Sequence, residues 1–396
     1  MIQEVAQTTS SPALRSSRID ETKAYSMVAS ENFSADVIRA QIEAILRAWG
    51  MDEDKLRLTA EVMVETDLRG VDSHGISMLT QYAQMQNAGQ LRLQAEPRIV
   101  RQSASTALID GGAGLGHPAA LMGMDLAIEK ALAHDVGIVS VFNSHHFGAA
   151  GYYATMAAER GLIGVVSSTT RVISVVPTNG VERVLGTNPI AVAVPAGSHP
   201  DICVDISTSV VAANKVKVYA LQGKELPPGW VIDGQGQPVT DSGQAFRQIF
   251  EGREGGLTPI GGDGSDMGGH KGYGLGLIAQ ILSGTLSGAS FSPVRNRTQK
   301  PSDPDNIGHF FMALNPAAFR PFDEFQADVE AIVDTLHTTR PVREDNPVLI
   351  PGEPEWTARE ERLAKGIPIP ETLKLKVQDI AEAAGAPYLL KAAMAA

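Results

Sequence analysis

Residues 106–142, TALIDGGAGLGHPAALMGMDLAIEKALAHDVGIVSVF, contain the pattern that decides the fold. A short apolar run, TALID, is followed by a glycine-rich turn, a helix-like stretch over 118–134 and a second apolar run, VGIVSVF. Strand-like runs that alternate with helix-like segments are typical of crossover units in an α/β sheet. The alternation continues with a helix expected over 149–160 and a strand at LIGVVSS, so the sequence predicts an α/β domain in the middle of the chain.

Further runs extend this domain toward the C-terminus. Strand-like stretches occur at Ile190–Val194, Ile202–Ile206 and 309–314, and an apolar helix is expected over 273–287. Residues 222–270 are rich in Gly, Pro and Asp, which predicts a long excursion over the surface.

Helical patterns flank this domain on both sides. Ser34 is a candidate N-cap for an amphipathic stretch that stops at Gly50, and a second stretch ends at Gly70. Residues 322–338 and 371–384 have the same character. We therefore expect four parts: a flexible extension at 1–30, the N-terminal part of a helical lobe at 31–104, the α/β domain at 105–320, and the C-terminal part of the helical lobe at 321–396.

The composition favours a protein that binds small molecules. The net charge is −12 and the pI about 5.3, without a cluster of Lys and Arg, which argues against a nucleic-acid or anionic membrane surface. Cys203 is the only cysteine, which excludes an intrachain disulfide and a cysteine-based zinc site. No secretory signal is visible, and no segment approaches the roughly 20 apolar residues of a spanning helix. We expect a cytoplasmic protein without membrane or nucleic-acid partners.

Two glycine-rich stretches are similar to nucleotide-binding loops but lack their defining residues. A Rossmann turn needs G-x-G-x-x-G and an acidic residue at the end of the next strand. Here the glycines stand at 112, 114 and 116, and the next strand ends in Asn143. DGSDMGGHKGYGLG differs from a phosphate loop because Gly272 follows Lys271, where Ser or Thr should bind magnesium. Both motifs are rejected, and Lys271 is either a point charge for a phosphate or a solvated surface lysine.

Two clusters, DSHG at 72–75 and NSHHFG at 143–148, place imidazoles beside glycine, where a ligand can approach the backbone closely. His145 and His146 on a strand face opposite ways and no third ligand pattern follows, so we expect one core and one site histidine rather than a metal site. His74 is either a proton-transfer group or a residue that complements a helix dipole. Ser73 lacks the surroundings of a nucleophile, so we expect its hydroxyl to orient His74.

Six collinear blocks carry a resemblance to a known family. They are DLRGVDSHG (67–75), NSHHFGAAGYY (143–153), GTNPIAV (186–192), DISTS (205–209), GGHKGYGL (268–275) and GHFFMALNP (308–316). From about residue 33 to about residue 365 the chain resembles the malate/L-lactate dehydrogenase family, which also contains ureidoglycolate and sulfolactate dehydrogenases and piperideine-2-carboxylate reductases. The resemblance implies a mixed-sheet α/β fold that binds NAD or NADP without the Rossmann turn, with 105–320 as the cofactor-binding domain. It also implies a homodimer whose cleft lies near the subunit interface.

The resemblance further implies roles for individual residues. His74 with Ser73 resembles the proton-donor pair of the imine reductases, whereas His146 resembles the residue proposed as acid/base in the ureidoglycolate enzymes. Asn188, in a turn after Gly186, is implied near the substrate. The residues implied around the dinucleotide are His146, Phe147, Gly148, Ala149, Ala150, Thr170, Asp205, Ile206, Ser207, Lys271, Gly352 and Glu353.

Two positions bear on the substrate. Hydroxy-acid members of the family have a lysine at the position of Lys215, where the imine reductases have an aspartate, and this favours alcohol/ketone chemistry. Four residues after His74, many members place an arginine that binds the substrate carboxylate, but this chain has Met78. A thioether cannot form that bidentate pair. Either Lys215 or Arg171 replaces the arginine, or the substrate carries its anion elsewhere or is more apolar.

Residues and resemblance together predict hydride transfer between C2 of a 2-hydroxy acid and a nicotinamide ring. An imidazole, His74 by preference, exchanges the hydroxyl proton, and Lys215 stabilises the developing negative oxygen or the carboxylate. Three alternatives are an NADPH-dependent cyclic imine reductase of the same fold, a non-catalytic small-molecule binding protein, and a metal-dependent hydrolase. Lys215 disfavours the first, the paired imidazoles disfavour the second, and chelators would inhibit the third. The sequence leaves the choice between NAD and NADP open.

Overall fold

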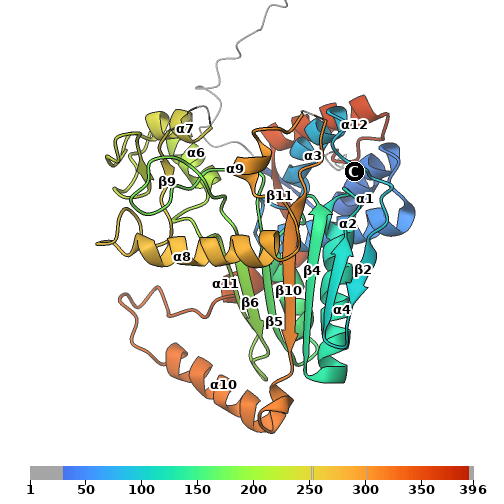
Figure 1. The fold of residues 1–396 in the computed structure, drawn as a ribbon, viewed down its shortest axis with the longest axis vertical. Coiled ribbons are helices and arrows are strands. Elements are labelled where there is room, and N and C mark those ends of the chain that lie inside the picture. The colour runs from blue at the N-terminus through green and yellow to red at the C-terminus, as the bar shows by residue number, and fades with distance from the viewer. Residues whose placement is uncertain (1–29, 251, 253, 301, 392–396) are drawn as a thin grey trace, which may run out of the picture.

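The centre of the molecule is a seven-stranded mixed sheet. The computed structural model describes residues 30–391 except 251, 253 and 301, so the extension expected at 1–30 lies, but for its last residue, outside the described residues. The sheet has the order β2-β3-β4-β10-β5-β6-β7, with β3 and β4 parallel and the other neighbours antiparallel (Figure 1). Its strands are β2 (Arg98–Gln102), β3 (Thr106–Asp110), β4 (Val136–Ser144), β5 (Ile163–Ser168), β6 (Ile190–Val194), β7 (Ile202–Ile206) and β10 (Ile307–Leu314). The predicted mixed α/β fold is confirmed.

Two helices cover one face of this sheet. They are α4 (Gly116–His134) and α5 (Ala150–Ala158), close to the bounds expected from the sequence, and they share an apolar core with side chains from β4, β5, β6 and β10. Gly123 lets α4 lie close to the sheet, because a Cβ there would be 2.8 Å from a ring carbon of Phe311 in β10. Burial of these apolar side chains holds sheet and helices together.

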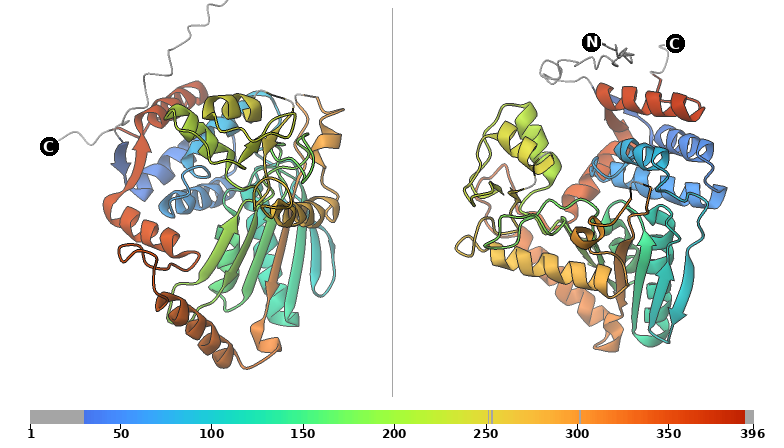
Figure 2. Two further views of the ribbon diagram at one scale, coloured as in Figure 1. Left: turned by 90° about the vertical axis from the view of Figure 1, so that its left-hand side faces the viewer. Right: turned by 45° about the horizontal axis from the view of Figure 1, so that its top comes forward.

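A helical lobe has its own apolar core. It contains α1 (Ala35–Ala48), α2 (Glu53–Leu68), a 3-10 turn (Ile76–Met78), α3 (Leu79–Asn87) and α12 (Glu371–Ala384), with β1 (Ser30–Phe33) and β11 (Ile367–Pro370) paired antiparallel. α11 (Glu353–Lys365) packs against α2, whereas α10 (Phe322–His337) lies at the far end of the sheet (Figures 1 and 2). Segments from both chain ends thus meet in this lobe, and the division into four parts stays a prediction.

A third group of elements surrounds a smaller core. It includes α6 (Ala213–Leu221), α7 (Ser242–Phe250) and a two-stranded sheet of β8 (Val231–Ile232) and β9 (Gly256–Leu257), packed around residues such as Val216, Leu226 and Ile249. The expectation of a surface excursion over 222–270 is therefore wrong for much of this segment. Its buried apolar residues stand apart between Gly, Pro and polar residues, so no helical or strand period marks them in the sequence.

The second face of the main sheet is less covered. α8 (Gly269–Gln280) and the π-helical turn after it (Ile281–Thr285) lie on the side of the sheet away from α4, followed by the short α9 (Ser292–Arg295) (Figure 2). One apolar row crosses five neighbouring strands in register, with each side chain partly exposed: Ile138, Met312, Val165, Val192 and Val204. Their sequence neighbours point into the core under α4 and α5. No helix of the described residues is long and apolar enough to cross a membrane.

Candidate functional site

The loop between α2 and α3 carries Ser73 and His74. The Ser73 hydroxyl lies 2.7 Å from Nδ1 of His74. The buried carboxylate of Asp67 accepts a hydrogen bond of 2.8 Å from the backbone N–H of Ile76. Gly75 lies directly against this carboxylate, since a Cβ on it would be 1.9 Å from Asp67 Oδ1. Burial raises the pKa of Asp67 to about 8.

The same loop is also tied to α11. Arg362 pairs with the carboxylate of Asp72 and donates a hydrogen bond of 2.5 Å to the carbonyl oxygen of Asp67. About one turn earlier, Arg359 lies 2.7 Å from Glu65 in α2. The position of His74 therefore depends on contacts from both α2 and α11.

His146 lies in the turn after β4, close to His74. The two ring centroids are 5.3 Å apart. Nδ1 of His146 lies 2.7 Å from the hydroxyl of Tyr82 in α3 and 3.3 Å from the backbone nitrogen of Gly148. Within residues 30–391 as described, Nε2 of neither imidazole has a hydrogen-bond partner, and both histidines are partly exposed. The structure brings the two candidate imidazoles together, each with one ring nitrogen available to a ligand.

Both imidazoles are neutral at pH 7. Burial lowers the pKa of His74. Burial, with the nearby His74, His117 and His309, lowers the pKa of His146 well below its ordinary value. His117 in α4 is fully buried, neither of its ring nitrogens has a partner among the described residues, and burial lowers its pKa to about 3. The cluster is therefore a layer of uncharged rings.

His145, the neighbour of His146, points into the interior. It is fully buried, with its ring nitrogens 3.3 Å from a carboxylate oxygen of Asp305 and 3.2 Å from the carbonyl oxygen of Gln90. In the part of the chain that the structure describes, no group of three His, Cys, Asp or Glu side chains could hold a metal ion. The pair divides into one core histidine and one histidine at the candidate site.

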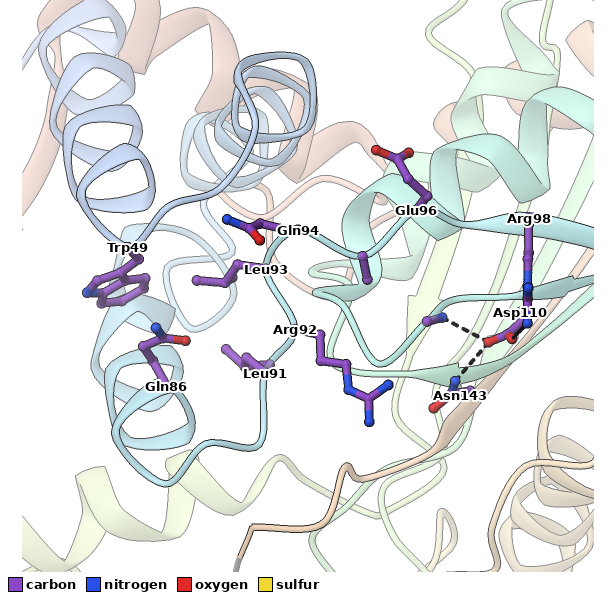
Figure 3. Close-up of a pocket in the computed structure, with 12 residues that line it drawn as sticks. Trp49, Gln86, Leu91, Arg92, Leu93, Gln94, Glu96, Arg98, Asp110 and Asn143 are labelled. Carbon is purple, nitrogen blue, oxygen red and sulfur yellow. Dashed lines mark hydrogen bonds and ion pairs between the residues drawn. The ribbon is translucent and has the colours of Figure 1, made fainter.

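An open hollow of about 710 Å³ lies between the helical lobe and the ends of β3 and β4 (Figure 3). Its walls include Trp49 after α1, the loop 91–96, and Asp110 and Asn143 from the ends of β3 and β4. Asn143 stands three residues before His146 and donates a hydrogen bond of 2.8 Å to Asp110. Figure 3 shows the guanidinium group of Arg92 directed into this space. His74 and His146 are not among the residues that line it.

Several residues implied around the dinucleotide lie together at the start of α5. The turn from His146 to Ala150 leads into this helix, and Gly151 donates its backbone N–H to Asp205 of β7 at 2.7 Å. Gly352 lies beside the same strand, because a Cβ on it would be 2.9 Å from the backbone nitrogen of Cys203. Glu353 begins α11 directly after it. The start of α5 and the start of α11 thus both lie against β7.

Other expected residues lie on α6, on α8 and after β5. Lys215 is exposed on α6, with Nζ 5.3 Å from the ring centre of Trp230, and no hydrogen bond joins it to an imidazole in the described structure. Lys271 is exposed in the first turn of α8. Thr170 follows β5 and packs against Gly186, where even a methyl group would collide with its hydroxyl.

Of the three residues expected at the substrate, His74 is partly exposed, whereas Met78 and Asn188 are buried. Met78 belongs to the core of the helical lobe and is 9% exposed. Asn188 is fully buried, and its amide donates a hydrogen bond of 3.1 Å to the carbonyl oxygen of Gly276. A direct substrate contact of either residue stays a prediction.

Sequence reasoning missed four residues of the cluster: Asp67, Tyr82, His117 and Arg362. Tyr82 stands at core spacing in a helix, and Arg362 comes 290 residues after its partner Asp72. Of these four residues, only Asp67 lay in a sequence block that pointed to the site, DLRGVDSHG, which begins with it.

The fold is a mixed-sheet α/β fold without a Rossmann turn, with His146 in the turn after β4 and His74 beside it. The chain belongs to the malate/L-lactate dehydrogenase family, which it matches over residues 33–378. It is therefore an oxidoreductase, and membership of this dehydrogenase family implies a nicotinamide cofactor. The resemblance inferred from the six sequence blocks is confirmed.

Three similar proteins illustrate this membership. The chain is 40% identical to a malate dehydrogenase of Pyrococcus abyssi over 351 residues, 88% of this chain and 94% of the relative. It is 36% identical to a malate/(S)-sulfolactate dehydrogenase of Methanothermus fervidus over 344 residues, 87% of this chain and 95% of the relative. The crystal structure of a malate dehydrogenase from Entamoeba histolytica superposes with a TM-score of 0.85 at 33% identity, covering 91% of this chain and 99% of that one.

Proposed function

We propose that the chain is an NAD(P)-dependent dehydrogenase that interconverts a 2-hydroxy acid and the corresponding 2-oxo acid. The observation that carries the proposal is the pair of neutral imidazoles, His74 and His146, whose centroids are 5.3 Å apart and whose Nε2 atoms have no partner in the described residues. The printed names of the relatives, malate and sulfolactate dehydrogenases, support this substrate class.

In this proposal His74 is the acid/base. Ser73 engages Nδ1, which leaves Nε2 for the substrate. Because burial lowers the pKa of His74, the ring is neutral at pH 7 and takes the hydroxyl proton during oxidation, and the imidazolium returns that proton during reduction. When bound, the dinucleotide supplies the hydride acceptor for oxidation and the hydride donor for reduction.

The residues present fit such a cofactor. Gly148 and Gly352 have φ angles of 86° and 102°, so both positions favour glycine, and they follow His146 and lie beside β7 respectively. The residues that would hold the dinucleotide are His146 to Ala150, Asp205 to Ser207, Gly352 and Glu353, with Thr170 and Lys271 providing a hydroxyl group and a positive charge. Lys215, an exposed residue of α6, is proposed to meet the negative charge of the substrate.

A substrate panel tests this function. 2-Hydroxy and 2-oxo acids, including malate and lactate, are assayed with NAD and NADP by the absorbance of the reduced nicotinamide. We expect turnover of at least one acid, and a loss of roughly 10²- to 10⁴-fold in His74→Ala with dinucleotide binding retained. Near wild-type turnover in both His74→Ala and His146→Ala would contradict the proposal, as would NADPH oxidation that occurs only with cyclic imines.

We propose a homodimer as the working unit. Its support is the apolar row on the less covered face of the sheet, together with exposed apolar side chains of α8 and its π-helical turn, such as Leu275, Ile278 and Ile281, which are 43%, 52% and 43% exposed. A second copy of the chain would remove these side chains from water. A cytoplasmic location and the lack of nucleic-acid and membrane partners stay predictions from composition.

A further inference from the structure

We infer that His146 acts as a neutral hydrogen-bond donor through Nε2, and that Tyr82 is the positioning residue that holds it in this form. The inference rests on the proposed function, in which His74 exchanges the proton. It assigns different tasks to two imidazoles that the sequence left interchangeable.

The hydrogen bonds at Nδ1 of His146 fix where the ring hydrogen sits. The backbone N–H of Gly148 faces Nδ1 at 3.3 Å, and a backbone N–H can only donate. Nδ1 must therefore present its lone pair. The hydroxyl of Tyr82, 2.7 Å from the same nitrogen, then donates as well. A neutral imidazole that accepts at Nδ1 carries its hydrogen on Nε2, the atom without a protein partner in the described residues.

These surroundings are the reverse of those around a histidine base. A catalytic base donates its second ring N–H to an acceptor, commonly a carboxylate, which stabilises the imidazolium that forms. Here both partners of Nδ1 are donors. The titratable groups that act on the ring are His74 from the loop after α2, His117 from α4 and His309 from β10, with the Tyr82 phenol from α3, and none of them is an acid that could balance a positive charge.

Tyr82 is suited to this task because the packing around its side chain restricts rotation of the ring. The side chain is fully buried in the core of the helical lobe. Burial also raises the pKa of its phenol, so the hydroxyl keeps the hydrogen that it donates.

The chemistry follows from this arrangement. During oxidation His74 takes the hydroxyl proton of the substrate, and the Nε2–H of His146 would donate to the substrate oxygen and stabilise the negative charge that develops there, with a bound dinucleotide supplying the hydride acceptor. During reduction the same N–H polarises the carbonyl group. His146 keeps its proton throughout.

Glutamine substitutions separate a donor from a base, because a glutamine amide donates a hydrogen bond but cannot take a proton. We expect His146→Gln to keep turnover within about 10-fold of the wild type, and His146→Ala to lose about 10²- to 10³-fold. At His74, the matched control, glutamine and alanine should be equally inactive. Equal losses in both His146 variants would overturn the inference. An active His74→Gln would contradict the proposed function instead.

Two further measurements test the role of Tyr82. Tyr82→Phe removes one donor and keeps the ring, so we expect kcat to fall with a new acidic limb in its pH profile as His146 begins to take up a proton, while the Kd of the dinucleotide stays unchanged. A pH profile identical to that of the wild type would contradict this role. Nitrogen-15 NMR of the wild type without substrate should show the hydrogen on Nε2 of His146, and a hydrogen on Nδ1 would refute the inference whatever the activity assays show.

Discussion

Asp67 makes the stability of the protein depend on pH, and Asp67→Asn should remove that dependence. The residue is 2% exposed, and burial raises its pKa from 3.8 to about 8. Between pH 3.8 and about 8, Asp67 keeps its proton in the folded protein but loses it in the unfolded chain. The contribution of this group to the free energy of unfolding is therefore fully present below pH 3.8 and decreases as the pH rises to about 8. In this range the free energy of unfolding falls by about 1.4 kcal/mol per pH unit, and the total loss at pH 7 is about 4 kcal/mol.

Urea unfolding followed by tryptophan fluorescence, repeated from about pH 5 to about pH 8.5, measures this slope. Asparagine keeps the volume of the side chain and an oxygen that can accept the N–H of Ile76. We expect the free energy of unfolding of Asp67→Asn to gain about 1.4 kcal/mol over the wild type with each pH unit in this window. Asp36→Asn, at a side chain that is 92% exposed, is the control and should leave the slope unchanged. Parallel curves for Asp67→Asn and the wild type would refute the reasoning.

Three further predictions concern the loop, the interface and the substrate. Gly75→Ala places a Cβ 1.9 Å from Asp67 Oδ1 and should displace the loop, lowering kcat by about 10²-fold while the Kd of the dinucleotide is kept; an unchanged kcat would show that the loop adapts. Ile278→Asp should yield monomers in sedimentation velocity, whereas Leu132→Asp, at the exposed side of α4, should not; a variant that sediments as the wild type does would argue against an interface at α8. Met78→Arg should raise kcat/KM for malate by about 10-fold relative to lactate if the missing arginine sets specificity, and an unaltered ratio would discount that idea.

Local patterns predicted much of the fold. β6 and β7 have the expected bounds, and α4 and α5 differ from expectation by only a few residues, because alternation and glycine boundaries are properties of neighbouring residues. Strand order is not such a property. The run at β10 was recognised as a strand, but its insertion between β4 and β5 depends on pairing over more than a hundred residues.

The site was predictable to a similar degree. His74 and His146 stand beside glycines in polar turns, which marks them as candidates. Tyr82 has no such mark, because an aromatic residue at core spacing in a helix is ordinary, and its hydroxyl matters only through the distance to His146. For Lys215 the reverse is true. The family pattern marks it as a site residue, but in the structure its ammonium group lies over the ring of Trp230.

The late arrival of β10 has a consequence for synthesis on the ribosome. β4 and β5 emerge early, yet the strand that separates them begins only at Ile307. Until then each of the two strands has an open edge of unpaired backbone groups, which can pair with another nascent chain. Chains that terminate before residue 307 should therefore aggregate, whereas the sheet can close once β10 has emerged from the ribosome.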